Sequence, residues 1–219
     1  LTFSSILIGA VLGIITGIIS AVKQYSFIDR ITTVFALFGI SAPSFWLALM
    51  FIIIFSINLG WLPTSGSYSF KYWILPCATL GLQATGIIMR MTRSSMLEVI
   101  RQDYIRTARA KGQTEFIVIM KHAFRNALIP IITAIGNQTS VLIGGSVLVE
   151  TVFAMPGLGK YIIDGINSLD YPAVQGAILI ISFMTIAVML IVDIVYTFVD
   201  PRIKVIYSAK SGRNSDGKK

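Results

Sequence analysis

The sequence predicts an all-α, polytopic membrane protein, and three observations support this fold class. Of its 219 residues, 55% are hydrophobic and only 13% are charged, which is more apolar material than a water-soluble domain of this length needs. The apolar residues are gathered into five runs nearly free of charge, each long enough as a helix to cross a hydrocarbon layer of about 30 Å. Basic residues are concentrated between these runs, as expected for loops on the cytoplasmic side of a membrane.

The five predicted spans, in chain order, are residues 1–22, 31–57, 72–89, 126–149 and 171–199. The first run has no basic segment at its start and no small-residue cleavage site, so it is not a signal peptide. The second contains Pro43, which predicts a kink and a freed carbonyl that a neighbouring helix must satisfy. The third is short, and Arg90 and Arg93 mark its cytoplasmic end.

Two of the connecting segments are predicted to be outside loops. Residues 58–71 are rich in glycine, proline, serine and aromatic residues, with Trp61 and Trp73 near the membrane interface. Residues 150–170 have a turn-like centre at 155–160.

The distribution of basic residues predicts how the five spans are oriented in the membrane. Sixteen basic residues fall on the side that the positive-inside rule makes cytoplasmic, and two, Lys71 and Lys160, fall outside. The inside group is Lys23, Arg30, Arg90, Arg93, Arg101, Arg106, Arg109, Lys111, Lys121, Arg125, Arg202, Lys204, Lys210, Arg213, Lys218 and Lys219. The first residue is therefore predicted outside and the C-terminus in the cytoplasm. Residues 1–204 form the predicted transmembrane domain, and the polar tail 205–219 is predicted to be disordered.

Composition also excludes several classes of function. Most of the net charge of +8 belongs beside membrane spans, so no nucleic-acid partner is expected. The single Cys77 excludes an internal disulfide and a cysteine metal cluster, and His122 stands without neighbouring ligands in the sequence. The chain has no glycine-rich phosphate loop ending in Gly-Lys-Ser/Thr, so we do not expect it to hydrolyse ATP. We predict no catalytic residue, metal or cofactor.

The basic segment between the third and fourth spans, residues 101–126, reads as a helical hairpin. Tyr104, Ile105 and Ala108 recur at helical spacing, and Gly112 then interrupts the pattern at a point where a left-handed turn is cheap. A second amphipathic stripe follows, made of Phe116, Ile117, Ile119, Met120, Ala123 and Phe124. Such a hairpin is shaped to dock onto a cytoplasmic partner, although periodicity alone equally allows a surface helix whose basic residues touch anionic lipid.

At this hairpin the sequence resembles the membrane-spanning subunits of bacterial ABC importers, and most of all the dipeptide, oligopeptide and nickel branch. That superfamily carries a cytoplasmic EAA loop, a Glu-Ala-Ala triplet followed by a glycine and a later proline. The corresponding positions here are residues 106–108, Gly112 and Pro130. Only the second alanine is kept and the Gly-to-Pro spacing is longer, and both departures resemble the peptide and nickel branch, with its TARAKG and HAxRNAxxP motifs at 107–112 and 122–130.

Further matches to that branch cover nearly the whole chain. They are GWLPTSG at 60–66, ETVFAMPGLG at 150–159, DYPAVQG at 170–176 and DPRI at 200–203. Members of this family have a sixth helix and an outside segment before the first run seen here, so we expect material upstream of Leu1.

The resemblance implies a permease subunit, without enzymatic activity of its own, in the inner (cytoplasmic) membrane of a bacterium. Two such subunits, usually a heterodimer, would form the pathway for a peptide, two cytoplasmic ATPases would bind the EAA hairpins, and an extracytoplasmic binding protein would deliver the solute. Membrane lipid would surround the assembly. The ATPase-coupling residues it implies are Arg106, Thr107, Ala108, Arg109, Ala110, Lys111 and Gly112. Arg109 and Lys111 could equally be solvated charges.

Polar residues inside or beside the spans are the other candidates. Asn137, Gln138 and Ser140 could line the pathway, or each could make an interhelical hydrogen bond. Glu150 could organise the outer loop or touch the binding protein, or be a capped interfacial carboxylate. Asp193 lies within the last span, where we favour a structural hydrogen bond.

Rival functions explain less of the sequence. A nickel or metal-chelate importer of the same family remains open, since the sequence does not give the substrate. A gradient-driven secondary transporter needs ion-coordinating residues at the midplane, and only Asp193 could serve. An intramembrane enzyme needs a catalytic pair or an HExxH motif inside the spans, and neither is present in the sequence.

Overall fold

The computed structural model describes residues 1–199, and over this part of the chain it consists of helices joined by loops, without strands. The all-α prediction is confirmed. The helices are α1 (Thr2–Val22), α2 (Phe27–Ser41), α3 (Ser44–Phe51), η1 (Ile52–Asn58), α4 (Phe70–Ile100), α5 (Asp103–Ala110), α6 (Glu115–Ile117), η2 (Val118–Phe124), α7 (Arg125–Gly145), α8 (Val147–Val152), α9 (Leu158–Asn167) and α10 (Tyr171–Val199), where η marks π-helical turns.

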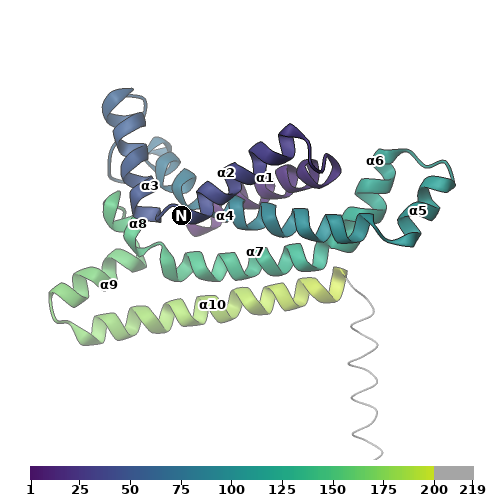
Figure 1. The fold of residues 1–219 in the computed structure, drawn as a ribbon. Coiled ribbons are helices and arrows are strands. Elements are labelled where there is room, and N and C mark those ends of the chain that lie inside the picture. The colour runs from purple at the N-terminus through teal and green to yellow at the C-terminus, as the bar shows by residue number, and fades with distance from the viewer. Residues whose placement is uncertain (200–219) are drawn as a thin grey trace, which may run out of the picture.

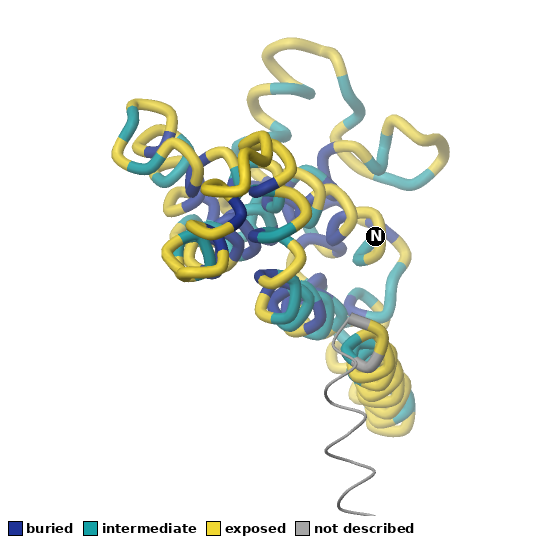
Figure 2. Tube along the Cα trace, turned by 90° about the vertical axis from the view of Figure 1, so that its right-hand side faces the viewer, coloured by how far each residue is buried: buried dark blue, intermediate teal, exposed yellow. Residues whose placement is uncertain are grey.

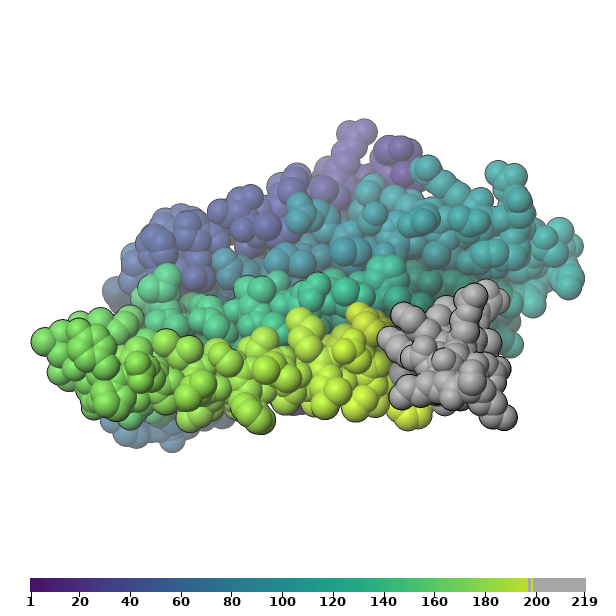
Figure 3. Space-filling view, turned by 90° about the horizontal axis from the view of Figure 1, so that it is seen from below, coloured from purple at the N-terminus to yellow at the C-terminus, as the bar shows by residue number. Residues whose placement is uncertain are grey.

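The long helices lie side by side, with α4 at the centre (Figure 1). One side of α4 packs against α1 and α2, and the other against α7, which in turn packs against α10. The hairpin of α5 and α6 lies at one end of this layer, and α3, α8 and α9 lie at the other. Figure 3 shows α10 along one face of the molecule, and the most apolar stretch of α10 lies wholly outside the core.

Close packing of α1 on α4 comes from small residues at every fourth position of α1. Ser5, Gly9, Gly13, Gly17 and Ala21 are all buried. A Cβ built on Gly13 would lie 2.9 Å from Cβ of Ile88, and one built on Gly17 would lie 2.6 Å from Cβ of Thr92. Small residues at this spacing let two membrane helices approach closely, which is what happens along the whole length of α1.

The predicted second span is broken rather than merely kinked. The helices on either side of Ala42 and Pro43 are bent by 106°, because Pro43 cannot continue the helix and forces Ala42 into an extended conformation. The carbonyl of Ala42 accepts a hydrogen bond of 2.9 Å from Nε2 of Gln83 on α4. A neighbouring helix therefore satisfies one of the carbonyls that the break leaves without a partner in its own helix.

The number of spans depends on this bent pair. Within residues 1–199, four helical stretches are long and apolar enough to cross a membrane: Thr2–Val22, Phe70–Ile100, Glu115–Gly145 and Tyr171–Tyr196. The bent pair makes a fifth if its two halves cross together. The helices of the third and fourth predicted spans, α4 and the continuous helix Glu115–Gly145, extend well beyond residues 72–89 and 126–149 at the hairpin end. Their extensions carry polar and basic residues.

The second outside segment is more ordered than the predicted loop. Residues 150–170 contain the second half of α8 and all of α9, separated by a break that includes Pro156 and Gly157. The first outside segment is a loop, as predicted, and the amide of Gly66 donates to the carbonyl of Phe153, 2.9 Å away. The two outer segments therefore support one another.

The basic residues that the structure describes divide between the two ends. Ten of those predicted inside lie on or beside the hairpin end of the helices: Lys23, Arg30, Arg90, Arg93, Arg101, Arg106, Arg109, Lys111, Lys121 and Arg125. Lys71 begins α4 at the opposite end, and Lys160 lies in α9 there. The predicted disordered tail, residues 205–219, and the remaining basic residues lie outside the described part of the chain.

Candidate functional site

The predicted hairpin forms a protrusion at one end of the molecule, which faces the viewer in Figure 2. Helix α5 follows α4 after only two residues, and a turn at 111–114 leads into α6. From Glu115 the helix runs through the π-turns of η2 into α7 without a break, up to Gly145. The hairpin is thus continuous with α7 and almost continuous with α4.

Gly112 makes the turn, as the sequence predicts. Its φ is +75°, in the left-handed region that favours glycine. Its amide donates to the carbonyl of Arg109 at 2.9 Å, which closes the end of α5. A Cβ at Gly112 would meet no atom within 4 Å, so the demand for glycine comes from the backbone and not from crowding within the described chain.

Two side-chain contacts brace the hairpin across this turn. Nε and Nη2 of Arg109 donate to the two carboxylate oxygens of Glu115, at 2.8 Å and 3.2 Å. A ring nitrogen of His122 lies 2.7 Å from Oε1 of Gln113. Arg109 is therefore an ion-pair partner within the hairpin, in addition to being partly exposed, and His122 helps to hold the second arm.

The inner face of the hairpin is anchored in a hydrophobic cluster shared with the ends of α1, α4 and α7. The buried members of the cluster are Ala21, Met96, Ile105, Ala108, Val118, Ala123, Ala127 and Ile131. Ile105 and Val118 have no exposed surface. Because the hairpin shares this core with three long helices, a force applied to it reaches those helices directly.

The outer face of the hairpin carries most of the predicted coupling residues. Arg106, Thr107, Arg109, Ala110, Lys111 and Gly112 are exposed. Ala108 is buried, so it packs on the cluster below. The hydroxyl of Thr107 donates to the carbonyl of Asp103, one turn back in α5.

Several large apolar side chains of the hairpin are also exposed, although the sequence pattern placed them on a packing stripe. Phe116 is 75% exposed, and Tyr104, Ile117 and Met120 are exposed beside it in the same hairpin. Partial burial raises the pKa of the Tyr104 phenol, which stays neutral at physiological pH. Periodicity gave the helix and part of its covered face, since Ala123 is buried and Ile119 and Phe124 pack against the cluster. It did not give Val118, which fills the inner position while Phe116 is exposed.

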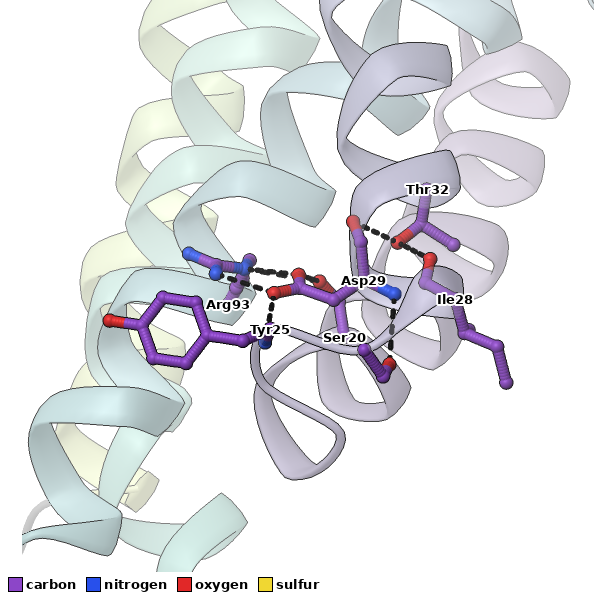
Figure 4. Close-up of polar contacts among 7 residues, drawn as sticks. Ser20, Tyr25, Ile28, Asp29, Thr32 and Arg93 are labelled. Atoms are coloured by element: carbon purple, nitrogen blue, oxygen red, sulfur yellow. Dashed lines mark hydrogen bonds and ion pairs between the residues drawn. The ribbon is translucent and has the colours of Figure 1, made fainter.

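A partly buried ion pair that sequence reasoning missed lies at the same end (Figure 4). Nε and Nη2 of Arg93 on α4 donate to the two carboxylate oxygens of Asp29 in the first turn of α2, at 2.8 Å and 2.9 Å. The hydroxyl of Ser20 on α1 and the amide of Tyr25 also donate to this carboxylate. The cluster ties α1, α2 and α4 together, and the acid and base, 64 positions apart in sequence, gave no local signal.

The polar residues predicted in the fourth span point in different directions. Gln138 is buried on the face of α7 that also carries Ala134 and Leu142. Asn137 is exposed, and Ser140 is half-buried with its hydroxyl bonded to the carbonyl of Gly136. Asn137 alone of the three lies fully open on the described surface.

Glu150 is buried at the other end of the molecule. Its carboxylate accepts hydrogen bonds from the hydroxyl of Ser146 at 2.7 Å and from the amides of Gly159 and Lys160 at 2.8 Å and 3.3 Å. Those amides begin α9, so Glu150 caps that helix from α8, where a negative charge is favoured. The geometry matches a carboxylate that organises the outer segment.

Two other features of the spans can be placed. Gly144 and Gly145, at the end of α7, face open space in the described chain, whereas the glycines of α1 make close contacts with α4. Asp193 is exposed on α10. Within residues 1–199, no three His, Cys, Asp or Glu side chains gather as a metal site.

Comparison with known proteins finds a matching family and similar relatives. The model of the family described as binding-protein-dependent transport system inner membrane component matches residues 13–205. The chain is 44% identical to the dipeptide transport system permease protein DppB of Alkalihalophilus pseudofirmus, over 93% of this chain and 70% of that protein. It is 43% identical to the glutathione transport system permease protein GsiC of Escherichia coli K12, over 93% of this chain and 67% of that protein.

The chain is shorter than these relatives. It spans 64% of the length of a peptide transport system permease protein of Brucella abortus, to which it is 46% identical.

Solved structures show the same fold. The inward-facing MetNI methionine ABC transporter gives a TM-score of 0.72 at 21% identity, covering 91% of each chain. An amino acid ABC transporter gives a TM-score of 0.64 at 16% identity, covering 88% of each chain.

Proposed function

We infer the function from one premise: the chain belongs to the family of binding-protein-dependent transport system inner membrane components. On that premise it is a permease subunit of an ATP-driven bacterial importer. It forms part of the translocation pathway, and its hairpin receives the motion of a separate cytoplasmic ATPase. Its C-terminus and hairpin lie in the cytoplasm, in accord with the basic residues at that end.

The observation that carries this proposal is the hairpin itself. A rigid, braced turn with an exposed face of Arg106, Lys111 and Gly112 is built on a buried cluster that reaches three long helices. An ordinary surface helix has no need of such anchoring. The exposed Phe116 adds an apolar contact to this docking face, since a side chain that is 75% exposed has no partner within the described chain to cover it.

The connections of the hairpin suggest how its motion is transmitted. ATP binding would move the ATPases and the hairpins seated on them, and each hairpin would carry α4 and α7 with it. The Asp29–Arg93 pair would make α1 and α2 follow α4 as one body. The helices would thereby rock between inward-open and outward-open states, whose populations ATP shifts.

Asn137 and Glu150 suggest where the translocation pathway and its extracytoplasmic opening lie. Asn137 lies on an exposed face of α7 and is the best candidate for pathway lining among the predicted residues. Glu150 orders α8 and α9, which would form the surface that an extracytoplasmic binding protein meets. A second permease subunit would complete the pathway, and two ATPases would bind the pair.

The substrate we propose is a short peptide. The names of the similar proteins refer to dipeptide, peptide and glutathione transport, and glutathione is itself a tripeptide. This favours a peptide over the nickel complex that the sequence left open. Uptake of a labelled dipeptide by cells that carry or lack the full-length gene would test the substrate class, with nickel uptake measured in parallel.

The coupling role is tested by purification of the full-length chain from bacterial membranes, as wild type, Gly112→Arg and Gly112→Asn. Asparagine tolerates the left-handed conformation better than most residues and adds little bulk, so it is the matched control. We expect an ATPase with a phosphate-binding loop in the wild-type and Gly112→Asn eluates, and its loss from Gly112→Arg. A well-folded wild type without any ATPase would refute the coupling assignment, as would full retention by Gly112→Arg.

A further inference from the structure

A pocket of about 560 Å³ lies between α2 and α4 at the hairpin end, outside the docking face described above. Its polar lining residues are Thr33 of α2, Arg90, Arg93, Ser94 and Glu98 of α4, and Arg101 and Gln102, which directly follow α4. The residues of α4 that line it recur three or four positions apart, so one face of this helix supplies most of the wall.

The charge of the pocket is not balanced by its own residues. Three arginines face one glutamate. Arg90 and Arg101 are exposed and make no ion pair within the described chain. Arg93 uses Nε and Nη2 on Asp29, which fixes its side chain and leaves Nη1 without a hydrogen bond there (Figure 4).

This arrangement fits a phosphate group. Guanidinium groups bind phosphate oxygens in pairs, and a guanidinium already held by a buried carboxylate loses little freedom on binding. Ser94 and Thr33 add hydroxyl donors to the same wall. The fit favours an anion, because Arg90 and Arg101 remain unpaired after Asp29 has paired with Arg93, and Glu98 offsets only one of them.

The position of the pocket identifies the source of the phosphate. It begins at Met89 and Arg90, where the charge-free run of α4 ends, which is the level expected for lipid head groups. Leu37, one turn from Thr33 on α2, is exposed and would lie against an acyl chain. Basic pockets between helices at this level typically hold anionic lipid head groups.

We propose that this pocket binds the head group of an anionic phospholipid, with Arg90 and Arg93, one helical turn apart, beside its phosphate and Arg101 at the far end of the pocket, toward the rest of the head group. A lipid held there would brace α2 against α4 beside the base of the hairpin. The proposal requires only that the chain spans a membrane, and it is independent of the solute and of the ATPase.

The test is native mass spectrometry of the full-length protein, released from vesicles of phosphatidylglycerol and phosphatidylcholine in equal amounts. Arg90 and Arg101 are replaced together by glutamine, and Arg93 is left in place to keep Asp29 paired. The matched control replaces Lys23 and Arg30 by glutamine, since both are exposed basic residues at the same end but outside the pocket. Each basic residue beside an anionic lipid contributes about fivefold to binding, so the pocket variant should retain phosphatidylglycerol about 25-fold less well.

The expected result is retained phosphatidylglycerol on the wild type and the control, and its loss from the pocket variant. Equal loss from both variants would overturn the proposal in favour of a general charge effect. Displacement of the lipid by inorganic phosphate would overturn it in favour of a site for a free anion. Loss of a co-purifying protein subunit from the pocket variant, with lipid retention unchanged, would show that a protein covers the pocket instead.

Discussion

Gly9→Ala is the substitution whose effect the structure defines most sharply. An ideal Cβ at Gly9 would lie 2.5 Å from Cβ of Ala84, and 3.2 Å from both the carbonyl carbon of Ala84 and the carbonyl oxygen of Gly81. Carbon atoms pack favourably at about 3.5–4.0 Å, so α1 and α4 must separate locally by about 1 Å. None of the three atoms is the end of a flexible side chain, so rotation cannot relieve the clash.

The magnitude follows from two opposing effects. Alanine is a better helix former than glycine by about 1 kcal/mol. Overpacking typically costs about 1–3 kcal/mol, and here the separation also loosens the contacts of Gly13 and Gly17 along the same helix. We expect a net loss of about 1–2 kcal/mol, which for a chain of this size corresponds to a fall in Tm of about 2–8 °C.

The assay is thermal unfolding of the full-length protein in detergent, followed by tryptophan fluorescence. Gly176→Ala on α10 is the control, because a Cβ there meets nothing within 4 Å and the substitution should be neutral or stabilising. Ala84→Gly removes the nearest obstacle, so the double variant should recover most of the Tm lost by Gly9→Ala. An unchanged Tm for Gly9→Ala, or no recovery in the double variant, would refute the packing argument.

Three further predictions concern polar side chains. Arg93→Ala removes the charged partner of the buried Asp29 carboxylate and leaves it only the donors of Ser20 and Tyr25, so it should destabilise the protein by about 1.5–3 kcal/mol, measured as a fall in Tm, while Arg30→Ala beside the pair should have little effect. Glu150→Gln removes the charge that caps α9, at a cost of about 1 kcal/mol, and should make the segment 150–170 more sensitive to limited proteolysis without a comparable change at 58–71. Thr92→Val should leave Tm unchanged or raise it, because the buried Thr92 hydroxyl has no hydrogen-bond partner within residues 1–199 and valine has the same shape.

Each of these three predictions can fail clearly. A small effect of Arg93→Ala would mean that Asp29 finds another partner or water. Unchanged proteolysis of Glu150→Gln would show that α9 does not depend on its carboxylate cap. A lower Tm for Thr92→Val would indicate that the hydroxyl has a partner in the assembled protein.

The position of the hairpin turn could be predicted from the sequence because its cause is local. Gly112 interrupts two amphipathic stretches, and the structure gives it the left-handed φ that this reasoning requires. The bend at Pro43 had a local cause as well, but its size of 106° did not, since it depends on how α3 packs against α4 and α8. The α1 glycines at every fourth position were a readable signal, and they mark the closest helix contact better than Gly144 and Gly145 do.

The sequence alone determined the fold class, the last span and the end of the helical layer at which the basic residues gather. Hydropathy and charge are properties of each residue and do not depend on how the helices pack. Only the tertiary structure decided what lies against what. It paired Asp29 with Arg93, placed Val118 rather than Phe116 on the inner face of the hairpin, and turned the second outer loop into helices around Glu150. Those outcomes depend on contacts between residues distant in sequence, where the cost of burying an unpaired charge or leaving a gap selects one arrangement.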